Sequence, residues 1–376
     1  MTRFAFVLAP ALLFAACSPP TSRQQEAREV PKIEMSAEAR AAMERINEAR
    51  FVSAPLRPSE DARPEQTQPA GEDARAATPP ASVQFDGGLV RIQTLLDRAH
   101  FSPGVIDGYA GENVRKAIAA YERANGLPET GEPSDTLLTR LERADSAPAL
   151  VSYVIREEDV RGPFVDVPRE FLAQSRLDRL AYESPAEALA EKFHMDQDLL
   201  ETLNPGVDFS VAGAEIVVTS VRGGLPGTVA AIEVDKSELA LRAFDASGQL
   251  LAYYPVTIGS EENPAPSGEV TVEAVAFDPT YNYDPAKLPS MRNAAPHALT
   301  IAPGPNNPVG LVWIALSVGS YGIHGTPEPS LISKTVSHGC TRLTNWDAVE
   351  LARAVQPGVR VNFVERSQAR RETRRG

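Results

Sequence analysis

Cysteine and long apolar runs are both scarce in this chain. Its 376 residues include only two cysteines, Cys17 and Cys340, so no disulfide can form in the mature protein if Cys17 is processed. Lysine and arginine total 37 against 50 aspartates and glutamates, a net charge of −13, which argues against a nucleic-acid partner. The apolar stretch at residues 4–14 is too short to span a bilayer. The whole chain is 43% hydrophobic, and its length is sufficient for two or three globular domains.

The N-terminus predicts an export signal over residues 1–17. A short basic start precedes the apolar stretch, which ends at Leu13-Phe14-Ala15-Ala16-Cys17. This ending resembles a bacterial lipobox, with Phe14 where an aliphatic residue is preferred. The resemblance implies a lipid anchor on Cys17, a periplasmic or cell-envelope location and, with Ser18 next, the outer membrane. The alternative is an ordinary secretory signal cut at Ala-x-Ala-like residues, with Cys17 incidental.

Two segments have the composition of unfolded chain. Residues 18–86 are rich in proline, alanine, glutamate, glutamine and arginine, which predicts a flexible tether. One helix is expected within it, over residues 36–50, with Ser36 as its N-cap. Residues 366–376 form an arginine-rich tail that we expect to be solvated, with weak attraction to anionic polymers as the alternative.

Residues 87–145 have the pattern of a compact helical unit. Apolar side chains recur at helical spacing in three stretches separated by tight loops. With Gln93, Ile106-Asp107-Gly108 and Gly126-Leu127, the unit resembles the three-helix peptidoglycan-binding domain, although Tyr121-Glu122 stands where that family has Phe-Gln. The resemblance implies binding to peptidoglycan glycan strands. A plain three-helix bundle without a ligand is the alternative.

Residues 150–221 predict a small βααβ unit, with two apolar helices and a closing strand. Leu203-Asn204-Pro205 and Ala212-Gly213-x-x-Ile216 resemble elements of the LysM module, a family that binds N-acetylglucosamine chains. Glu183-Ser184 replaces the Gly-Asp that is usual before its first helix. His194 is expected at the surface or partly packed, without a ligand role.

The pattern changes to closely spaced strands and turns over residues 226–365. Such a pattern predicts a mainly-β sandwich or barrel. A short helix after Asn345 and a last strand at residues 359–363 complete this region. The expected fold class is therefore multidomain α+β: a mainly-β domain preceded by a three-helix domain and a βααβ module.

Two histidines and Cys340 fall within one short span of the β domain. His324-Gly325-Thr326 is followed, sixteen positions after His324, by the cysteine in Ser337-His338-Gly339-Cys340-Thr341-Arg342. A thiol is nucleophilic as its thiolate, and a neighbouring imidazole is the usual means of producing one. Glycines allow backbone amides to approach a reacting carbonyl and hold an oxyanion. The pattern predicts a cysteine acyl-transfer site.

These motifs are similar to the signature of the YkuD-type L,D-transpeptidases. Pro266-Ser267-Gly268 and residues 304–310 match a turn and a loop that precede the signature in that family. Two positions depart from the pattern: Thr341 stands where isoleucine or valine is commonest, and Ser333 where glycine is common. The likeness covers roughly residues 228–364.

The resemblance implies a role for each site residue. Cys340 is the nucleophile, His324 is the general base, and the Gly325 carbonyl orients the imidazole. The backbone amides of Gly339 and Cys340 form the oxyanion hole. His338 would assist at the oxyanion hole or brace the loop, and Arg342 would bind a carboxylate or brace the loop. Tyr321 and Ser337 would bind substrate. Trp313 would line the cleft or, by preference, lie in the strand core.

The implied reaction has two steps. Cys340 attacks the peptide bond before the terminal D-Ala of a peptidoglycan stem tetrapeptide, and D-Ala leaves a thioester behind. A side-chain amine of another stem then accepts the acyl group and gives a 3→3 cross-link. A lysine of an envelope lipoprotein, a free D-amino acid and water stay open as acceptors, and water would make the enzyme an L,D-carboxypeptidase. No cofactor is implied.

Three other interpretations stay open. A metal site from His324, His338 and Cys340 lacks a fourth ligand at short spacing. A different cysteine hydrolase of the cell wall has the same residue types. A non-catalytic wall-binding scaffold would be signalled by loss of Cys340 or His324, and both are present. His100 and His297 have no partners in the sequence and receive no role.

Overall fold

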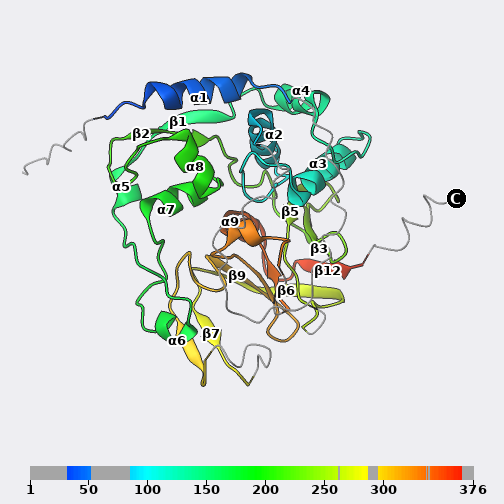
Figure 1. Cartoon of the computed structure of the whole chain (residues 1–376). Helices are drawn as coiled ribbons and strands as arrows, with labels where there is room; N and C mark the ends of the chain where they lie inside the picture. Colours follow the sequence, from blue (N-terminus) through cyan, green and yellow to red (C-terminus); the bar gives the residue numbers. More distant parts are fainter. Residues whose placement is uncertain are drawn as a thin grey trace, which may run out of the picture. The chain divides into compact units, whose positions relative to one another are not determined.

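The computed structural model describes residues 32–51, 85–260, 263–286, 295–335, 337 and 339–365 (Figure 1). The predicted export signal with Cys17, residues 52–84 of the predicted tether, His338 and the basic tail lie outside the described residues. In the part that the structure describes, no helix is both long and apolar enough to cross a membrane.

Three helices form the first module, as the sequence predicts: α2 (Gly87–Arg98), α3 (Glu112–Ala124) and α4 (Asp135–Ala144). Their apolar stripes meet in one core that includes Leu89, Ile92, Leu96, Ile118, Leu138 and Leu141. The loop between α2 and α3 is held from inside by the Gln93 side chain, which donates to Asp107 and accepts from the Gly108 amide, both at 2.8 Å. Gly108 has φ +75° and lies against Phe85, so only glycine suits that turn.

Helix α1 (Ala37–Glu48) begins at the predicted cap, where the Ser36 hydroxyl accepts a hydrogen bond from the Ala39 amide at 3.1 Å. Its buried apolar face packs into the core of the βααβ unit. The prediction that residues 18–86 are a tether is therefore wrong for residues 32–51, which belong to the folded protein. The sequence shows the apolar stripe of this helix but not the surface that it covers.

The second module has the expected βααβ order. Strands β1 (Leu150–Val154) and β2 (Glu215–Thr219) pair antiparallel, and α7 (Pro185–Lys192) and α8 (Gln197–Leu203) lie between them in the chain. Two short helices, α5 (Glu157–Val160) and α6 (Phe171–Gln174), interrupt this order between β1 and α7. The excursion brings the Phe171 ring against Tyr283 of the β domain, with centroids 5.3 Å apart.

A single curled sheet builds the β domain, with strand order β11-β10-β9-β6-β12-β3-β4-β5. Just beyond β5, Thr257 pairs with Arg342 of β11, so the two edges of the sheet meet. The sequence predicted a sandwich or a barrel. The structure has one curled sheet, so the two packed sheets of a sandwich are not found in the described β domain. Its strands are β3 (Ala231–Asp235), β4 (Ala240–Phe244), β5 (Leu250–Pro255), β6 (Gly268–Phe277), β9 (Val312–Leu316), β10 (Gly322–His324), β11 (Thr341–Arg342) and β12 (Arg360–Val364).

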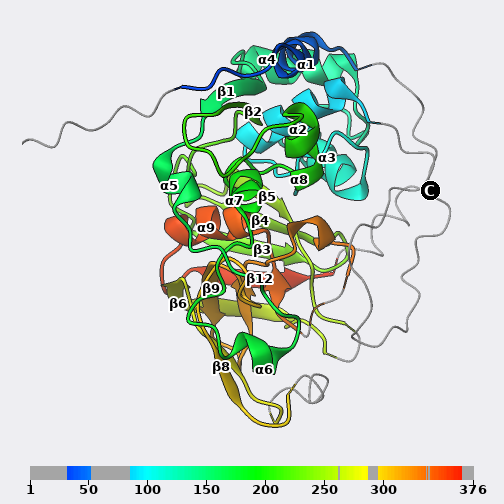
Figure 2. The ribbon, with the colours of Figure 1, turned by 60° about the vertical axis from the view of Figure 1, so that its left-hand side comes forward.

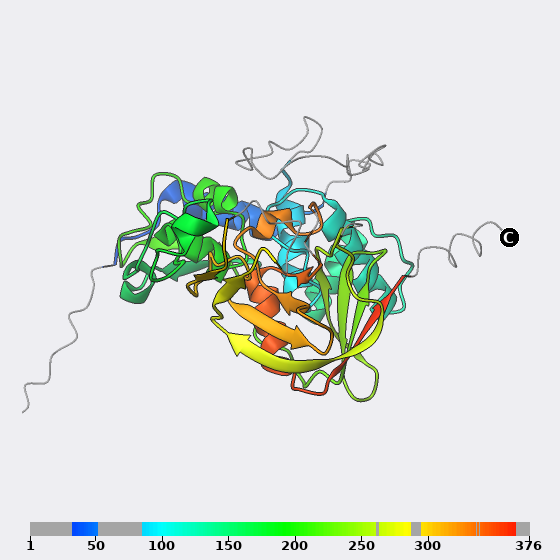
Figure 3. The same cartoon turned by 90° about the horizontal axis from the view of Figure 1, so that it is seen from below.

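Helix α9 (Asn345–Ala354) packs its apolar face against this sheet, and Figure 3 shows β6 curving past it. A separate pair, β7 (Tyr281–Tyr283) and β8 (Leu299–Ile301), forms a two-stranded sheet. Figures 1 and 2 agree that this pair lies at one end of the β domain and the helical modules at the other.

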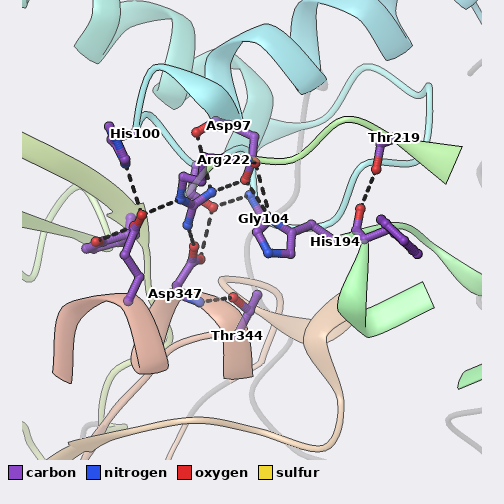
Figure 4. Close-up of polar contacts among 12 residues, drawn as sticks. Asp97, His100, Gly104, His194, Thr219, Arg222, Thr344 and Asp347 are labelled. Atoms are coloured by element: carbon purple, nitrogen blue, oxygen red, sulfur yellow. Dashed lines mark hydrogen bonds and ion pairs between the residues drawn. The ribbon is translucent and has the colours of Figure 1, made fainter. Parts of the chain in front are cut away.

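A buried cluster of charges joins the modules (Figure 4). The side chain of Arg222, which follows β2, is 2% exposed and contacts three carboxylates: Asp97 of α2, and Asp347 and Glu350 of α9. The guanidinium donates to Asp347 at 2.5 Å and to Glu350 at 2.8 Å. Burial alone would raise the pKa of Asp97, but Arg222 and His194 hold it well below its usual range. Burial and the two neighbouring carboxylates raise the pKa of Asp347 to about 6, against the opposing effect of Arg222.

Two histidines complete this cluster. His194 Nδ1 lies 3.0 Å from the Asp97 carboxylate, and its ring stacks on Trp346 with centroids 5.0 Å apart. His100 Nδ1 lies 3.0 Å from Glu350. The expectation that His194 is at the surface or partly packed is wrong, because it is buried between modules. Its partner is 97 positions away in the chain, so no local pattern reveals the pairing.

Candidate active site

Strand pairing brings the predicted base and nucleophile together. Strands β10 and β11 pair in parallel, with Ile323 opposite Thr341 and His324 opposite Arg342. Cys340 stands directly before β11, so it lies beside the strand that carries His324. Continued by one residue, this register places Cys340 across from Gly322, two positions before His324 on the adjacent strand.

His324 is held as a neutral base. It is 4% exposed, its Nδ1 donates to the Gly325 carbonyl at 2.7 Å, and its ring stacks on Trp313 with centroids 5.6 Å apart. Because a carbonyl can only accept, Nδ1 carries the proton and Nε2 keeps a lone pair. Burial and the charge of Arg342 lower the pKa of His324 to about 3, against the opposing hydrogen bond to Gly325. The imidazole is therefore uncharged at neutral pH.

The Cys340 thiol is partly exposed, and its Sγ lies 3.9 Å from the Ser320 carbonyl. Burial raises the pKa of Cys340, although the Gly322 amide and the Arg342 charge act in the opposite direction. At rest the site thus holds a thiol and a neutral imidazole, without a preformed ion pair. Among the hydrogen bonds of the described residues, none joins the thiol to His324, and such catalytic contacts often tighten only with substrate.

The turn before Cys340 is braced from within. Gly339 has φ +116°, and a Cβ there would lie 2.8 Å from the Tyr321 ring. The Gly339 amide donates to Ser337 Oγ at 3.2 Å, and the Ser337 hydroxyl donates to the Cys340 carbonyl at 2.5 Å. Ser337 is 3% exposed, so it supports the turn, and the prediction that it binds substrate is not supported. Nor is the Gly339 amide free for an oxyanion in this geometry.

Arg342 is the cation beside the thiol. In the described part of the chain its guanidinium has no ion-pair partner, and its buried Nε has no hydrogen-bond partner. Burial lowers the pKa of Arg342, and its charge acts on both Cys340 and His324. Of the two roles that the sequence left open, this geometry favours carboxylate binding over loop bracing.

The structure explains one of the two departures from the family pattern and leaves the other without an explanation. Ser333 has φ +64°, the left-handed region that favours glycine, and its hydroxyl and amide bond to Val256 and Thr257 instead. Thr341 is 1% exposed, and its hydroxyl has no hydrogen-bond partner among the described residues.

Replacing Thr341 by valine is therefore expected to stabilise the protein by about 1 kcal/mol, because it removes an unsatisfied buried hydroxyl and keeps the shape. Thermal unfolding of the full chain measures the effect. The matched control is Thr344→Val, since the Thr344 hydroxyl caps α9 by accepting from the Asp347 amide at 3.2 Å, and its loss should cost about 1 kcal/mol. A lower melting temperature for Thr341→Val would contradict the prediction.

Asn345 is buried behind the site. The sequence placed it at the end of the stretch that resembles the family signature and at the start of a helix, and gave it no role in the site. Its Oδ1 accepts from the Leu311 amide at 3.0 Å and lies against Gly325 and Gly310 so closely that neither could carry a Cβ. Its position shortly after the cysteine motif could have marked it as a site residue, but only the fold shows which groups it contacts. In the part of the chain that the structure describes, no group of three or more histidines, cysteines and carboxylates could hold a metal ion.

A thiol beside a buried neutral imidazole defines a cysteine acyl-transfer enzyme. A family model for the L,D-transpeptidase catalytic domain, YkuD, matches residues 230–363, and one for a putative peptidoglycan binding domain matches residues 86–141. The putative L,D-transpeptidase YkuD of Bacillus licheniformis is 31% identical over 180 residues, 47% of this chain and 92% of that protein. The chain therefore belongs to the YkuD family of L,D-transpeptidases.

Two further comparisons describe its relatives. The probable L,D-transpeptidase YbiS of Escherichia coli K12 is 33% identical over 187 residues, 48% of this chain and 60% of that protein. Among solved structures, an L,D-transpeptidase from Mycobacterium smegmatis is 20% identical, covers 41% of this chain and 64% of that one, and has a TM-score of 0.30. The family assignment rests on the sequence matches. This protein is an L,D-transpeptidase that carries a peptidoglycan-binding domain.

Proposed function

We propose that Cys340 and His324 carry out both steps of the transpeptidation. In the first, His324 Nε2 takes the thiol proton while Sγ forms a bond to the carbonyl carbon before the terminal D-Ala of a stem tetrapeptide. The C–N bond breaks, the proton passes to the leaving amine, and D-Ala departs from a thioester on Cys340. The observation that carries this proposal is the 2.7 Å bond from His324 Nδ1 to the Gly325 carbonyl, which leaves Nε2 as the base.

In the second step an acceptor amine attacks the thioester. Its nitrogen bonds to the acyl carbon, the C–S bond breaks, and the amine proton returns to Cys340 through His324, so the enzyme is regenerated. The acceptor that we propose is the side-chain amine of a second stem, which gives a 3→3 cross-link. A lysine of an envelope lipoprotein, a D-amino acid or water would use the same thioester.

Other site residues have narrower proposed roles. The backbone amide of Cys340 stabilises the oxyanion, since the Gly339 amide is used by Ser337. Arg342 binds a substrate carboxylate, since the buried Nε of its guanidinium has no hydrogen-bond partner among the described residues. Tyr321, whose hydroxyl donates to the Pro264 carbonyl at 3.2 Å, lines the cleft beside Gly339. The assisting role of His338 stays a prediction, because that residue lies outside the described ones.

The accessory modules serve attachment to the wall in this proposal. The match over residues 86–141 supports peptidoglycan binding by the three-helix module. The βααβ order supports a LysM-like module over residues 150–221, although the two-helix excursion after β1 sets it apart. The lipobox-like ending at Cys17 motivates a lipid anchor and an envelope location, with residues 18–31, which precede the folded part, as the tether.

Mass spectrometry of the products tests the reaction. The full chain is incubated with disaccharide tetrapeptides from a diaminopimelate-type wall. Loss of D-Ala together with dimers linked 3→3 is the expected result. Loss of D-Ala without dimers would identify a carboxypeptidase or an acceptor absent from the tube. No D-Ala loss and no acyl-enzyme on Cys340 would refute the proposed reaction.

A further inference from the structure

The βααβ module contacts the scaffold of the catalytic site through one carboxylate. Glu191, near the end of α7, accepts hydrogen bonds from the Asn345 side-chain amide at 3.1 Å on each oxygen. The Tyr182 hydroxyl donates to the same carboxylate at 2.8 Å. Glu191 thus belongs to the accessory module but ends on a residue of the catalytic domain.

Asn345 in turn forms the wall behind the Gly325 peptide. It is fully buried, and its side-chain amide also donates to the Pro305 carbonyl at 3.1 Å. Its Oδ1 lies against Gly325 so closely that a side chain could not be accommodated there. Three contacts fix the Asn345 amide plane: Glu191 and Pro305 on its nitrogen, and the Leu311 amide on its oxygen. A shift of this amide plane would press on the Gly325 backbone.

The Gly325 backbone is where the catalytic imidazole is oriented, since its carbonyl accepts from His324 Nδ1. A continuous series of contacts therefore runs from Glu191 through Asn345 and Gly325 to His324. We propose that Glu191 is a positioning residue for the transpeptidation, through which the docked βααβ module sets the orientation of the base. The inference rests on the proposed function of His324.

The second contact of the same helix supplies a comparison. Glu187, one turn before Glu191, accepts from the Asn306 side chain at 2.8 Å, and Asn306 also donates to the Ala181 carbonyl at 3.0 Å. Asn306 holds the loop before β9, and among the described hydrogen bonds none joins its side chain to Gly325 or His324. Glu187 therefore shares in docking the module without belonging to the series that ends on the base.

The surroundings of Glu191 make its effect dependent on pH. A cavity of about 280 Å³ adjoins it, and the charged groups that face this cavity are Glu187, Asp196 and Glu328. Burial, with Glu187 adding to it, raises the pKa of Glu191 to about 7, although the bonds from Tyr182 and Asn345 oppose this. The anion accepts from both donors, whereas the protonated acid turns one oxygen into a donor. Bracing of Asn345 should therefore strengthen as pH rises through about 7.

The test compares Glu191→Ala, Glu191→Gln and the control Glu187→Gln in the full chain. D-Ala release should show kcat about tenfold lower for Glu191→Ala with KM nearly unchanged, because the base is misplaced and the substrate site is not. Glu191→Gln keeps one acceptor and should fall between Glu191→Ala and the native protein. It should also lack the rise of kcat near pH 7 that we expect of the native protein. Glu187→Gln should keep native kcat.

Each other outcome decides against the inference. A kcat within twofold of native for Glu191→Ala would refute it, and equal losses in Glu191→Ala and Glu187→Gln would show that docking alone matters. If Glu191→Ala fails to fold, a native pH profile for Glu191→Gln refutes the inference instead. The alkylation rate of Cys340 by iodoacetamide, compared across the variants, reports on the base without substrate. It separates a failure of this inference from a failure of the proposed reaction.

Discussion

Replacing Cys340 by alanine is expected to lower D-Ala release by at least about 10⁴-fold, because the thioester cannot form without the thiol. The fold should survive, since Cys340 is only partly buried and the hydrogen bond of its side chain to Ser320 is long, at 3.9 Å. Binding to insoluble peptidoglycan should also persist, because residues 86–141 match the binding domain and Cys340 is not part of them. Product analysis, thermal unfolding and a sedimentation assay with peptidoglycan measure the three properties.

Two variants sharpen this experiment. His324→Gln keeps Cys340 but removes the base, so Cys340 should still be alkylated, more slowly than in the native protein, while D-Ala release falls by about 10²–10⁴-fold. Cys340→Ser keeps an oxygen nucleophile at this position. Because a hydroxyl is much less acidic than a thiol, this variant tests whether any nucleophile suffices. Turnover at the native rate in Cys340→Ala would overturn the mechanism and favour the alternative that the protein is a different hydrolase.

Replacing Arg222 by alanine is expected to give the largest loss of stability, about 3–5 kcal/mol. The substitution leaves Asp97 and Asp347, both fully buried, and Glu350 without the cation that they share. Thermal unfolding should therefore begin at a clearly lower temperature. The three-helix module and the β domain should also separate more readily, which limited proteolysis measures.

The pH dependence of this loss has a definite sign. Without Arg222 the buried carboxylates have raised pKa values, so their folded forms bind protons that the unfolded chain releases. Their contribution to stability is present at low pH and is lost as pH rises through those pKa values. The deficit of Arg222→Ala relative to native protein should therefore be larger at pH 8 than at pH 5.

The matched control for Arg222 is Arg179→Ala. Arg179 also joins an accessory segment to the β domain through a carboxylate, Asp278, at 2.7 Å, but both side chains are about two-fifths exposed. An exposed pair of this kind contributes about 0–1 kcal/mol. Equal losses for the two variants would show that burial of the Arg222 cluster is not what matters.

The elements with strong local signals were predictable. The three helices of residues 87–145 and the βααβ order followed from apolar spacing, because this pattern depends on neighbours three or four positions apart. The role of α1 was not predictable, because the apolar face of an amphipathic helix does not indicate which surface it packs against. The same holds for His100, whose partner Glu350 is 250 positions away.

The chemistry of this protein was determined by the sequence, since a cysteine, a histidine and their flanking glycines form one motif whose residue types admit few reactions. Tertiary structure alone decided how those groups are tuned. Burial makes His324 a neutral base, Ser337 is used to brace the turn before Cys340, and the buried Nε of Arg342 has no hydrogen-bond partner among the described residues. It also decided that the accessory segments contact the catalytic domain, through Arg222 and Glu191. Burial and pairing depend on groups that come together only when the chain folds, so no local sequence pattern records them.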